Sequence, residues 1–207
     1  MLWAEEVRPV TRVQYVDPPA PGAPDPEGLG ALFGEIGTAR GRVLDLHRAL
    51  AGAPAALRAY YRLSHHVRDE SSLDPRLREL AIVATGYFLD VPYELAHHLP
   101  AARRAGVTEE QLAAVRRWQT APRGVFDAAE RAVLAYADEV ARTRSAAPGT
   151  IARLQGVLSP VQLIDLVLTV AFYHLVAAVV LPLGIEPEDL SPGPAERRTR
   201  ARRPTGT

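Results

Sequence analysis

Apolar residues recur at the spacing of an α-helix along most of this chain. From Gly41 onward a first apolar stripe covers positions 43–50, and Pro54 can begin a second helix that ends near Asp69. No stretch of any length alternates apolar and polar residues with period two, which is the pattern of a half-buried strand. The pattern therefore predicts an all-α fold of seven or so helices.

One helix stands out because it is apolar on all sides. Asp74 followed by Pro75 is a favourable helix start, and positions 80–89 are apolar apart from Thr85. A helix without a polar face is expected to lie at the centre of the fold. Asp90 is then predicted to cap the following helix, with Pro92 tolerated in its first turn.

Capping boxes mark three of the later helices. Thr108 with Gln111 and Ser159 with Gln162 fit the pattern, and Asp127 with the glutamate three residues later is a looser version. The predicted helices cover residues 109–119, 128–143 and 160–181, with a short helix near 149–156.

The last of these helices is long and apolar enough to raise the question of a membrane span. The stretch 166–183 meets the length rule, but it carries His174 near its middle and lacks aromatic or arginine anchors at both ends. It is therefore interpreted as a buried core helix or a subunit-interface helix.

The chain divides into three parts by composition. Residues 1–40 contain five prolines between Pro18 and Pro26 and are interpreted as an extended Pro-rich arm. Residues 41–190 form the predicted helical domain. Residues 191–207 hold five arginines and no large apolar residue, which indicates a disordered tail or, alternatively, a tail that binds a polyanion.

Composition excludes several kinds of chemistry. The formal net charge is zero, so no partner such as nucleic acid or a membrane surface is expected. All 24 basic residues are arginine, and the absence of lysine excludes Schiff-base catalysis. The absence of cysteine excludes disulfides, thiolate nucleophiles and thiol peroxidase chemistry. The N-terminus lacks the apolar segment of a signal peptide, so a cytoplasmic location is expected.

Candidate chemistry is concentrated in the central helix and the helix after it. Glu79 is the last charged residue before the apolar run, so its carboxylate should be partly buried and should need a partner. Glu94 and His98 lie four residues apart on one helix face, with His97 beside them. An imidazole facing Glu79 across a helical hairpin would form a proton-transfer pair near neutral pH.

Other histidines and a metal site are weaker candidates. Adjacent His65 and His66 lack a nearby inward-facing acid in the sequence. His174 is either a core histidine or a residue that lines the pocket. The Glu94–His97 spacing matches one Glu-x-x-His motif of di-iron bundles, but those sites need a second such motif, so no metal and no cofactor are predicted.

The stretch from Leu73 to Leu112 resembles the carboxymuconolactone decarboxylase family, within the AhpD-like superfamily. It reads LDPRLRELAIVATGYFLDVPYELAHHLPAARRAGVTEEQL, and weaker similarity extends over roughly residues 41–190. The resemblance implies an all-helical domain that forms homo-oligomers, as trimers, hexamers or dimers, with the site near a subunit boundary.

The resemblance also implies roles for individual residues. In the peroxidase branch, the relay glutamate and histidine fall on Glu79 and His98, and the two cysteines fall on Val91 and Glu94. In the decarboxylase branch, Tyr93, Glu94 and His98 match. This chain departs from the decarboxylase pattern at two positions, with Leu95 in place of tryptophan and Asp90 in place of asparagine.

The leading hypothesis is a cofactor-independent enzyme that decarboxylates or isomerises a small organic acid or lactone by proton transfer. His98 is assigned as general acid/base, Glu79 as its partner and Glu94 as a second carboxylate. Tyr93, His97 and His174 are assigned to the substrate pocket. The alternatives are a binding or scaffold oligomer without catalysis, a metal-dependent enzyme that uses the Glu/His set, and a biosynthetic isomerase or cyclase.

Overall fold

The computed structural model describes residues 11–20 and 22–188, and the described residues are helical with no β-strand. The all-α prediction is confirmed. These ranges contain nine α-helices, one π-helical turn (η1) and one 3-10 turn (η2). Their bounds are α1 Leu29–Arg40, α2 Asp45–Leu50, α3 Pro54–His65, η1 His66–Glu70, α4 Pro75–Phe88, α5 Pro92–Arg104, α6 Glu109–Ala114, η2 Val115–Thr120, α7 Ala128–Thr143, α8 Pro148–Gln155 and α9 Pro160–Leu183.

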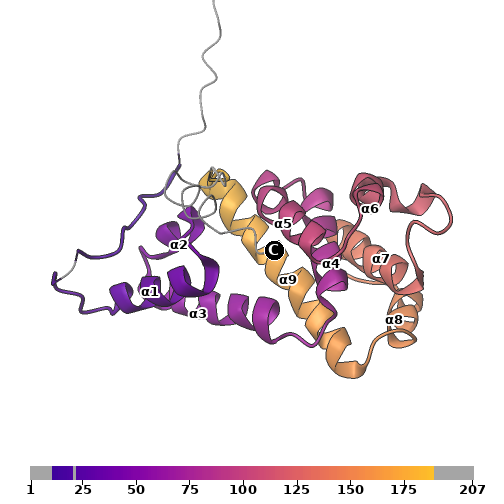
Figure 1. Ribbon diagram of the computed structural model, residues 1–207, viewed down its shortest axis with the longest axis horizontal. Coiled ribbons are helices and arrows are strands. Elements are labelled where there is room, and N and C mark those ends of the chain that lie inside the picture. The colour runs from indigo at the N-terminus through magenta and orange to yellow at the C-terminus, as the bar shows by residue number, and fades with distance from the viewer. Residues whose placement is uncertain (1–10, 21, 189–207) are drawn as a thin grey trace, which may run out of the picture.

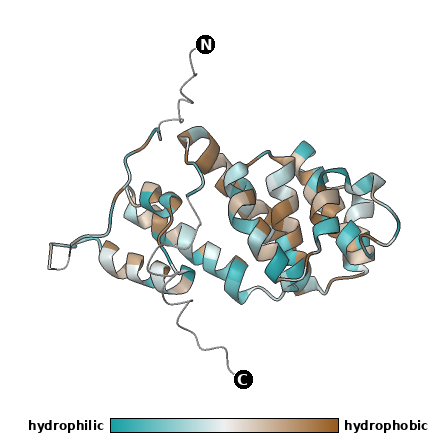
Figure 2. Cartoon of the chain, turned by 45° about the horizontal axis from the view of Figure 1, so that its top comes forward, coloured by the Kyte–Doolittle hydropathy of each residue, from teal (hydrophilic) through white to brown (hydrophobic). Residues whose placement is uncertain are grey.

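Helix α4 is the centre of the bundle and packs against α5, α7 and α9. The long helix α9 runs diagonally across the molecule, with α1–α3 on one side and α6–α8 on the other (Figure 1). Hydrophobic residues are frequent in the helices at the middle of the bundle (Figure 2). The α4–α5 hairpin is therefore held between the two halves of the chain.

The sequence of α4 explains its central position. Its N-terminus is capped by Asp74, whose Oδ1 accepts hydrogen bonds from the backbone N–H groups of Arg76 (2.9 Å) and Leu77 (3.2 Å). Every residue from Glu79 to Gly86 is buried, as expected for a helix that is apolar all round. The predictions of the start and of the burial of this helix are both confirmed.

The capping boxes at Thr108, Asp127 and Ser159 all form, each with its partner three residues later. The prediction that Asp90 caps α5 is wrong. Asp90 adopts a left-handed conformation (φ 55°) at the end of α4, and the N–H of Val91 donates to the carbonyl of Gly86 at 2.9 Å. This is the Schellman arrangement of a helix C-terminus, which commonly takes glycine or asparagine at the left-handed position.

The interpretation of residues 1–40 as an extended arm is wrong for its last part. Residues 29–40 form α1, and the buried side chains of Leu32, Phe33 and Ile36 pack with Leu57 and Tyr61 of α3. The prolines at 18–26 precede this helix and do not enter it, so they do not break it. The helical domain therefore begins near residue 29, whereas residues 1–10 and the proposed tail, 191–207, lie outside the described residues.

Helix α9 is the one helix within the described ranges that is long and apolar enough to cross a membrane. One of its faces packs into the bundle through residues that include Leu166, Val170 and Val176. Its opposite face leaves Val161 and Ile164 exposed to 63% and 58% in the single chain. The packing agrees with the interpretation as a core helix, and the exposed face bears on assembly.

Candidate active site

Glu79 and His98 meet between α4 and α5. The Glu79 Oε2 atom lies 2.9 Å from His98 Nδ1, and the two residues are only 7% and 3% exposed. Gly86 lets α4 and α5 pack closely, since a Cβ atom there would lie 3.2 Å from a Leu95 methyl and 3.3 Å from the Glu94 Cβ. The predicted pairing of an inward acid with an imidazole across the hairpin is present in the structure.

Tyr173 of α9 completes a chain of three side chains. Its hydroxyl lies 3.0 Å from His98 Nε2, and the two rings meet edge to face with centroids 4.9 Å apart. When Glu79 is ionised it accepts the Nδ1–H proton, which leaves His98 Nε2 to accept the Tyr173 hydroxyl hydrogen. The order Glu79–His98–Tyr173 resembles the carboxylate, imidazole and hydroxyl sequence of hydrolase triads in its hydrogen bonding.

Burial sets the ionisation of the Glu79–His98 pair. Desolvation lowers the pKa of His98 and outweighs the opposing effect of Glu79, so the imidazole is neutral near pH 7. Burial alone would raise the pKa of Glu79, but the hydrogen bond from His98 and the charge of Arg68 lower it overall. Burial also raises the pKa of Tyr173 well above its ordinary value, so the phenol keeps its proton.

Glu94 is a buried carboxyl group with an unused oxygen. It is 3% exposed, its Oε1 atom has no hydrogen-bond partner among the described residues, and its Oε2 atom lies 3.7 Å from His98 Nε2. Desolvation raises the pKa of Glu94 to about 8, although Arg68 acts in the opposite direction. At neutral pH Glu94 is therefore mostly a protonated acid that can donate a proton.

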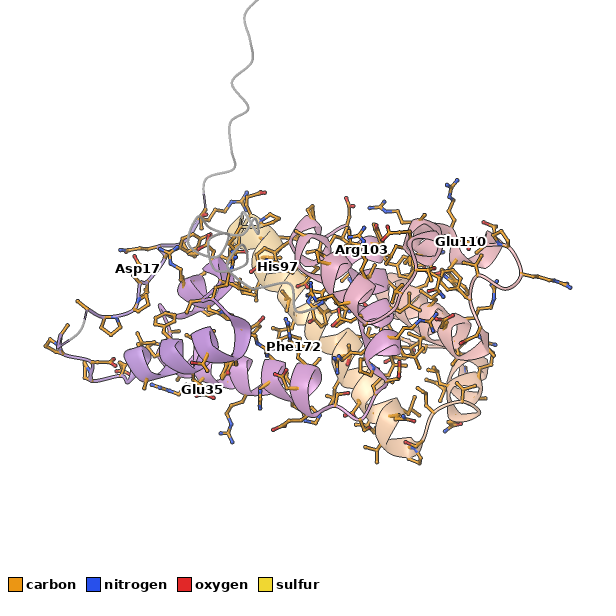
Figure 3. The ribbon with its side chains drawn as sticks, viewed as in Figure 1. Asp17, Glu35, His97, Arg103, Glu110 and Phe172 are labelled. Atoms are coloured by element: carbon orange, nitrogen blue, oxygen red, sulfur yellow. The ribbon has the colours of Figure 1, made fainter. Side chains whose placement is uncertain are left out.

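Tyr93 and His97 line the same region but are held by a third carboxylate, Glu188. His97 Nε2 lies 2.8 Å from Glu188 Oε2, and the Tyr93 hydroxyl lies 3.4 Å from Oε1. Glu188 Oε1 also accepts the backbone N–H of Asp45 at 2.5 Å, which ties the start of α2 to α5. In Figure 3, His97 on α5 and Phe172 on α9 mark this region, whereas Arg103 and Glu110 lie away from it.

Tyr93, Glu94, His97, His98 and Tyr173 help to line a small cavity with about 30 Å³ of space open to water-sized molecules. Space of this size holds about two water molecules or one small functional group. Its walls come from six elements, α1, α2, α3, η1, α5 and α9, with Leu44 between α1 and α2. The polar lining residues are Arg40, His47, Tyr60, Ser64, Arg68, Tyr93, Glu94, His97, His98 and Tyr173.

His47 is a cavity residue that the sequence analysis did not select. Its Nδ1 atom accepts the backbone N–H of Leu44 at 3.2 Å, so the neutral ring carries its proton on Nε2. Burial and the charge of Arg40 lower the pKa of His47 to about 4, which keeps the ring neutral. The stripe at positions 43–50 indicated a helix but did not show which way His47 faces.

Other histidines lie outside the cavity. His174 Nδ1 bonds to the carbonyl of Val170 at 2.9 Å, and His174 is absent from the cavity wall, so the adjacent Tyr173 occupies the place predicted for it. The expectation that His66 lacks an inward acid is wrong, since its Nε2 atom lies 3.2 Å from the buried Asp165 of α9. Asp165 is 93 residues from Ser72, whose N–H and hydroxyl it also accepts, so only the folded chain shows this contact.

The carboxylates of the hairpin do not converge as metal ligands would. Glu79 approaches His98 on Nδ1 and Glu94 approaches it on Nε2, so the two acids lie on opposite edges of the imidazole ring. Within residues 11–20 and 22–188, no three histidine or acidic side chains form a group that could hold a metal ion.

Known structures share this fold. A peroxidase-related protein from Silicibacter sp. TM1040 superposes with a TM-score of 0.69 at 19% identity, over 87% of this chain and 96% of that one. An AhpD-core, peroxidase-related protein from Ralstonia eutropha JMP134 has a TM-score of 0.66 at 20% identity, over 79% and 87%. A cysteine-to-alanine variant of the debrominase Bmp8, bound to 2,3,4-tribromopyrrole, has a TM-score of 0.66 at 17% identity, over 84% and 89%.

These likenesses show an AhpD-like all-α fold. The model of the carboxymuconolactone decarboxylase family matches residues 54–139, which contain α4 and α5 with Glu79, Glu94 and His98. This part of the chain is therefore similar to the carboxymuconolactone decarboxylase family, and the structural neighbours show that the described chain has the AhpD-like fold. No curated protein matches the sequence.

Proposed function

We propose that this protein is a cofactor-independent enzyme that moves protons on a small organic acid or lactone, by decarboxylation or isomerisation. One observation carries the proposal: a protonated acid, Glu94, and a hydrogen-bonded pair, His98 and Tyr173, line one cavity, and Glu79 contacts the far nitrogen of His98. Proton transfer to and from carbon uses an acid and a base placed in one site.

The base works through Tyr173. As a proton leaves the carbon beside a substrate carbonyl for the Tyr173 oxygen, the phenolic proton moves to His98 Nε2. The new imidazolium is stabilised by ionised Glu79, 2.9 Å from Nδ1. The electron pair of the broken C–H bond passes to the carbonyl oxygen and forms an enolate.

Glu94 supplies the opposite half of the reaction. In an isomerisation, its proton goes to the enolate at a different carbon, and the C–C π bond moves accordingly. In a decarboxylation, the C–C bond to the carboxylate breaks, carbon dioxide leaves, and the electron pair forms an enolate that Glu94 protonates on carbon. A buried carboxyl with a pKa of about 8 holds the required proton at neutral pH.

The family and the fold support an enzyme of this general type, and the cysteine-free sequence restricts the chemistry further. One structural neighbour is a debrominase, studied with a substituted pyrrole. This chain has Glu94 in the position that the resemblance assigns to a cysteine, and it has no cysteine elsewhere. Acid–base chemistry in the cytoplasm is therefore the proposed use of the fold here.

The test is turnover by His98→Gln against a panel of lactones and keto acids, with carbon dioxide release and isomer formation both measured. Wild type should convert at least one compound, and His98→Gln should lose turnover by about 100-fold or more while keeping its far-UV circular dichroism. His65→Gln, a surface histidine outside the cavity wall, is the matched control. Equal turnover by His98→Gln and wild type would refute the assignment. Ligand binding without any product would favour a binding oligomer.

We also propose that a second copy of this chain covers the exposed face of α9. Its apolar positions 161, 164, 168, 171, 175 and 178 are spaced alternately three and four residues apart and include no charged residue. This is the seam that two paired helices share, and a contiguous exposed apolar strip marks an association surface. Assembly as a homo-oligomer would bury this strip.

A further inference from the structure

Arg68 is a cation directed at the cavity without a partner of its own. It lies in the π-helical turn η1 and lines the cavity wall. Among the described residues it has no hydrogen bond and no ion pair, and other charged groups act on it only through longer-range attraction. A partly buried guanidinium with five unused donors is costly unless an anion satisfies them, because burial removes the water that would solvate the charge.

Arg40 brings a second positive charge to the same wall. Its side chain is 7% exposed, and its Nη2 atom lies 3.3 Å from both Ser64 Oγ and Asp69 Oδ2. Asp69 is itself 42% exposed, so the pair is partly solvated and leaves donors of Arg40 for the cavity. The two arginines come from α1 and η1, which are separate in the sequence and adjacent in the fold.

An outer hollow of about 280 Å³ continues the cavity toward the surface. The two spaces share Arg40, Leu44, Arg68 and His97, so the arginines stand at their junction. The outer hollow adds two more arginines and no acidic residue to its wall. Its full lining is Arg40, Arg42, Leu44, Arg68, His97, Pro100, Ala101 and Arg104. A concave surface lined by one sign of charge raises the local concentration of the opposite ion.

The inner cavity offers further hydrogen-bond donors. His47 carries its proton on Nε2 because Nδ1 is occupied by the N–H of Leu44, and Glu94 carries a proton on its carboxyl group. The inner space of about 30 Å³ admits a small planar group, whereas the remainder of a larger ligand fits the outer hollow. Both spaces therefore suit the negatively charged end of an extended small molecule.

We infer that Arg68 and Arg40 form a carboxylate-binding site at the mouth of the cavity, with the arginine-lined hollow as its entrance. A guanidinium binds a planar carboxylate through two parallel hydrogen bonds. The inner space of about 30 Å³ admits a flat carboxylate more readily than a larger tetrahedral anion. This inference rests on the proposed function for its meaning, since the ligand would be the substrate, but the binding itself does not require turnover.

The site should hold a carboxylate that survives the reaction. As carbon dioxide leaves, the negative charge of the departing carboxylate moves onto the enolate. Arginines that bind the departing carboxylate would therefore stabilise the substrate more than the transition state. A carboxylate retained in the product can be held equally well throughout. Arg68 thus positions the substrate and Glu94, His98 and Tyr173 act on another of its carbons.

The test measures binding of acetate to the full chain at pH 7, with acetamide as the uncharged isostere and inorganic phosphate as the tetrahedral anion. The readout is an NMR titration of the arginine Nε–H signals. Acetate should shift the Arg68 signal, and Arg68→Met should weaken its binding by about 10- to 100-fold. Arg123→Met, which removes an exposed arginine from the loop before α7, should bind acetate as wild type does.

Each outcome decides the inference. Equal binding of acetate and acetamide, or unchanged acetate affinity in Arg68→Met, overturns it, and tighter binding of phosphate overturns the choice of carboxylate. If Arg68→Met fails to fold, Arg68→Lys takes its place: it keeps the charge but loses the paired hydrogen bonds, so unchanged affinity would overturn the inference.

The same titration separates this inference from the proposed function. Acetate binding that persists in His98→Gln, with no compound turned over by wild type, would leave the anion site standing and remove the enzymatic proposal. Turnover that depends on His98 but not on Arg68 would support the enzymatic proposal and overturn the carboxylate site.

Discussion

Replacing Glu94 with glutamine should change the pH dependence of stability more than any other single substitution in the cavity. Glutamine keeps the size of the side chain but cannot ionise. Glu94 is 3% exposed with one oxygen unbonded among the described residues, so its ionised form is poorly solvated in the folded protein. In the unfolded chain the same carboxyl group ionises in water.

The magnitude follows from the two pKa values. Burial raises the pKa of Glu94 from 4.5 to about 8, and at about 1.4 kcal/mol for each tenfold change in ionisation the difference amounts to about 5 kcal/mol. Between these values the folded state binds more protons than the unfolded state, so wild-type stability falls as pH rises. The contribution of protonated Glu94 is fully present below pH 4.5 and is lost by about pH 8.

Glu94→Gln should therefore gain stability relative to wild type as pH rises, by up to about 5 kcal/mol at pH 9 compared with pH 4.5. Urea denaturation followed by far-UV circular dichroism, in steps from pH 4.5 to pH 9 at one protein concentration, measures the difference. Glu110→Gln removes an exposed carboxylate of α6 and should stay within about 0.5 kcal/mol of wild type throughout.

The reasoning would be refuted if the free energies of unfolding of wild type and Glu94→Gln changed with pH in parallel. If the difference between Glu94→Gln and wild type stayed constant within about 1 kcal/mol from pH 4.5 to pH 9, Glu94 would ionise in the folded protein as easily as in water. It could then not hold the proton that the proposed reaction needs at neutral pH. Any loss of turnover in Glu94→Gln would then need another cause.

Two further predictions concern α9. Tyr173→Phe should leave His98 Nε2 buried without its hydrogen-bond donor. Chemical denaturation should then show a free energy of unfolding lower by about 1–3 kcal/mol, and the substrate panel a turnover lower by about 100-fold. Unchanged turnover would show that Tyr173 takes no part in the proton transfer. Ile164→Glu should lower the mass of the assembly measured by light scattering, because it places a charge on the apolar face of α9. Ala113→Glu, at an exposed position of α6, should leave the mass unchanged. An unchanged mass in both variants would place the interface elsewhere.

The core of the site could be predicted because its signals are local. Glu79 is the last charge before an apolar run, and His98 lies on the next helix, so a short turn brings them together as the hairpin closes. The prediction that Asp90 caps α5 is wrong, because an aspartate between two helices can end the first as well as start the second. The error changed the cap but left the hairpin intact.

Tyr173 was missed because α9 is apolar on nearly every face. An amphipathic helix shows which residues face inward, but a helix without a polar side does not, and adjacent residues point about 100° apart. His174 was predicted to line the pocket because it is the one histidine of α9, but Tyr173 is the residue that contacts His98. A choice between neighbours on such a helix depends on tertiary packing.

The other parts of the cavity wall come from remote segments. Glu188 lies 91 residues from His97, and the two meet only when the segment that follows α9 packs on α5. Arg68 sits in a run of polar residues typical of an exposed helix end, and the π-helical turn there changes the direction that the α-helical period would give it. Neither residue type nor spacing indicates such a role.

The catalytic candidates and the arginines lie on different elements, which suggests how the site can vary without losing its chemistry. Glu79, Glu94 and His98 lie on two packed helices, where burial itself creates the pKa of about 8 at Glu94. Arg40 and Arg68 lie on α1 and η1 at the rim, where a change of side chain alters what the hollow attracts but leaves the hairpin packed. If the two proposals hold, substitutions at the rim should change KM and the choice of substrate, whereas substitutions in the hairpin should lower kcat for every substrate.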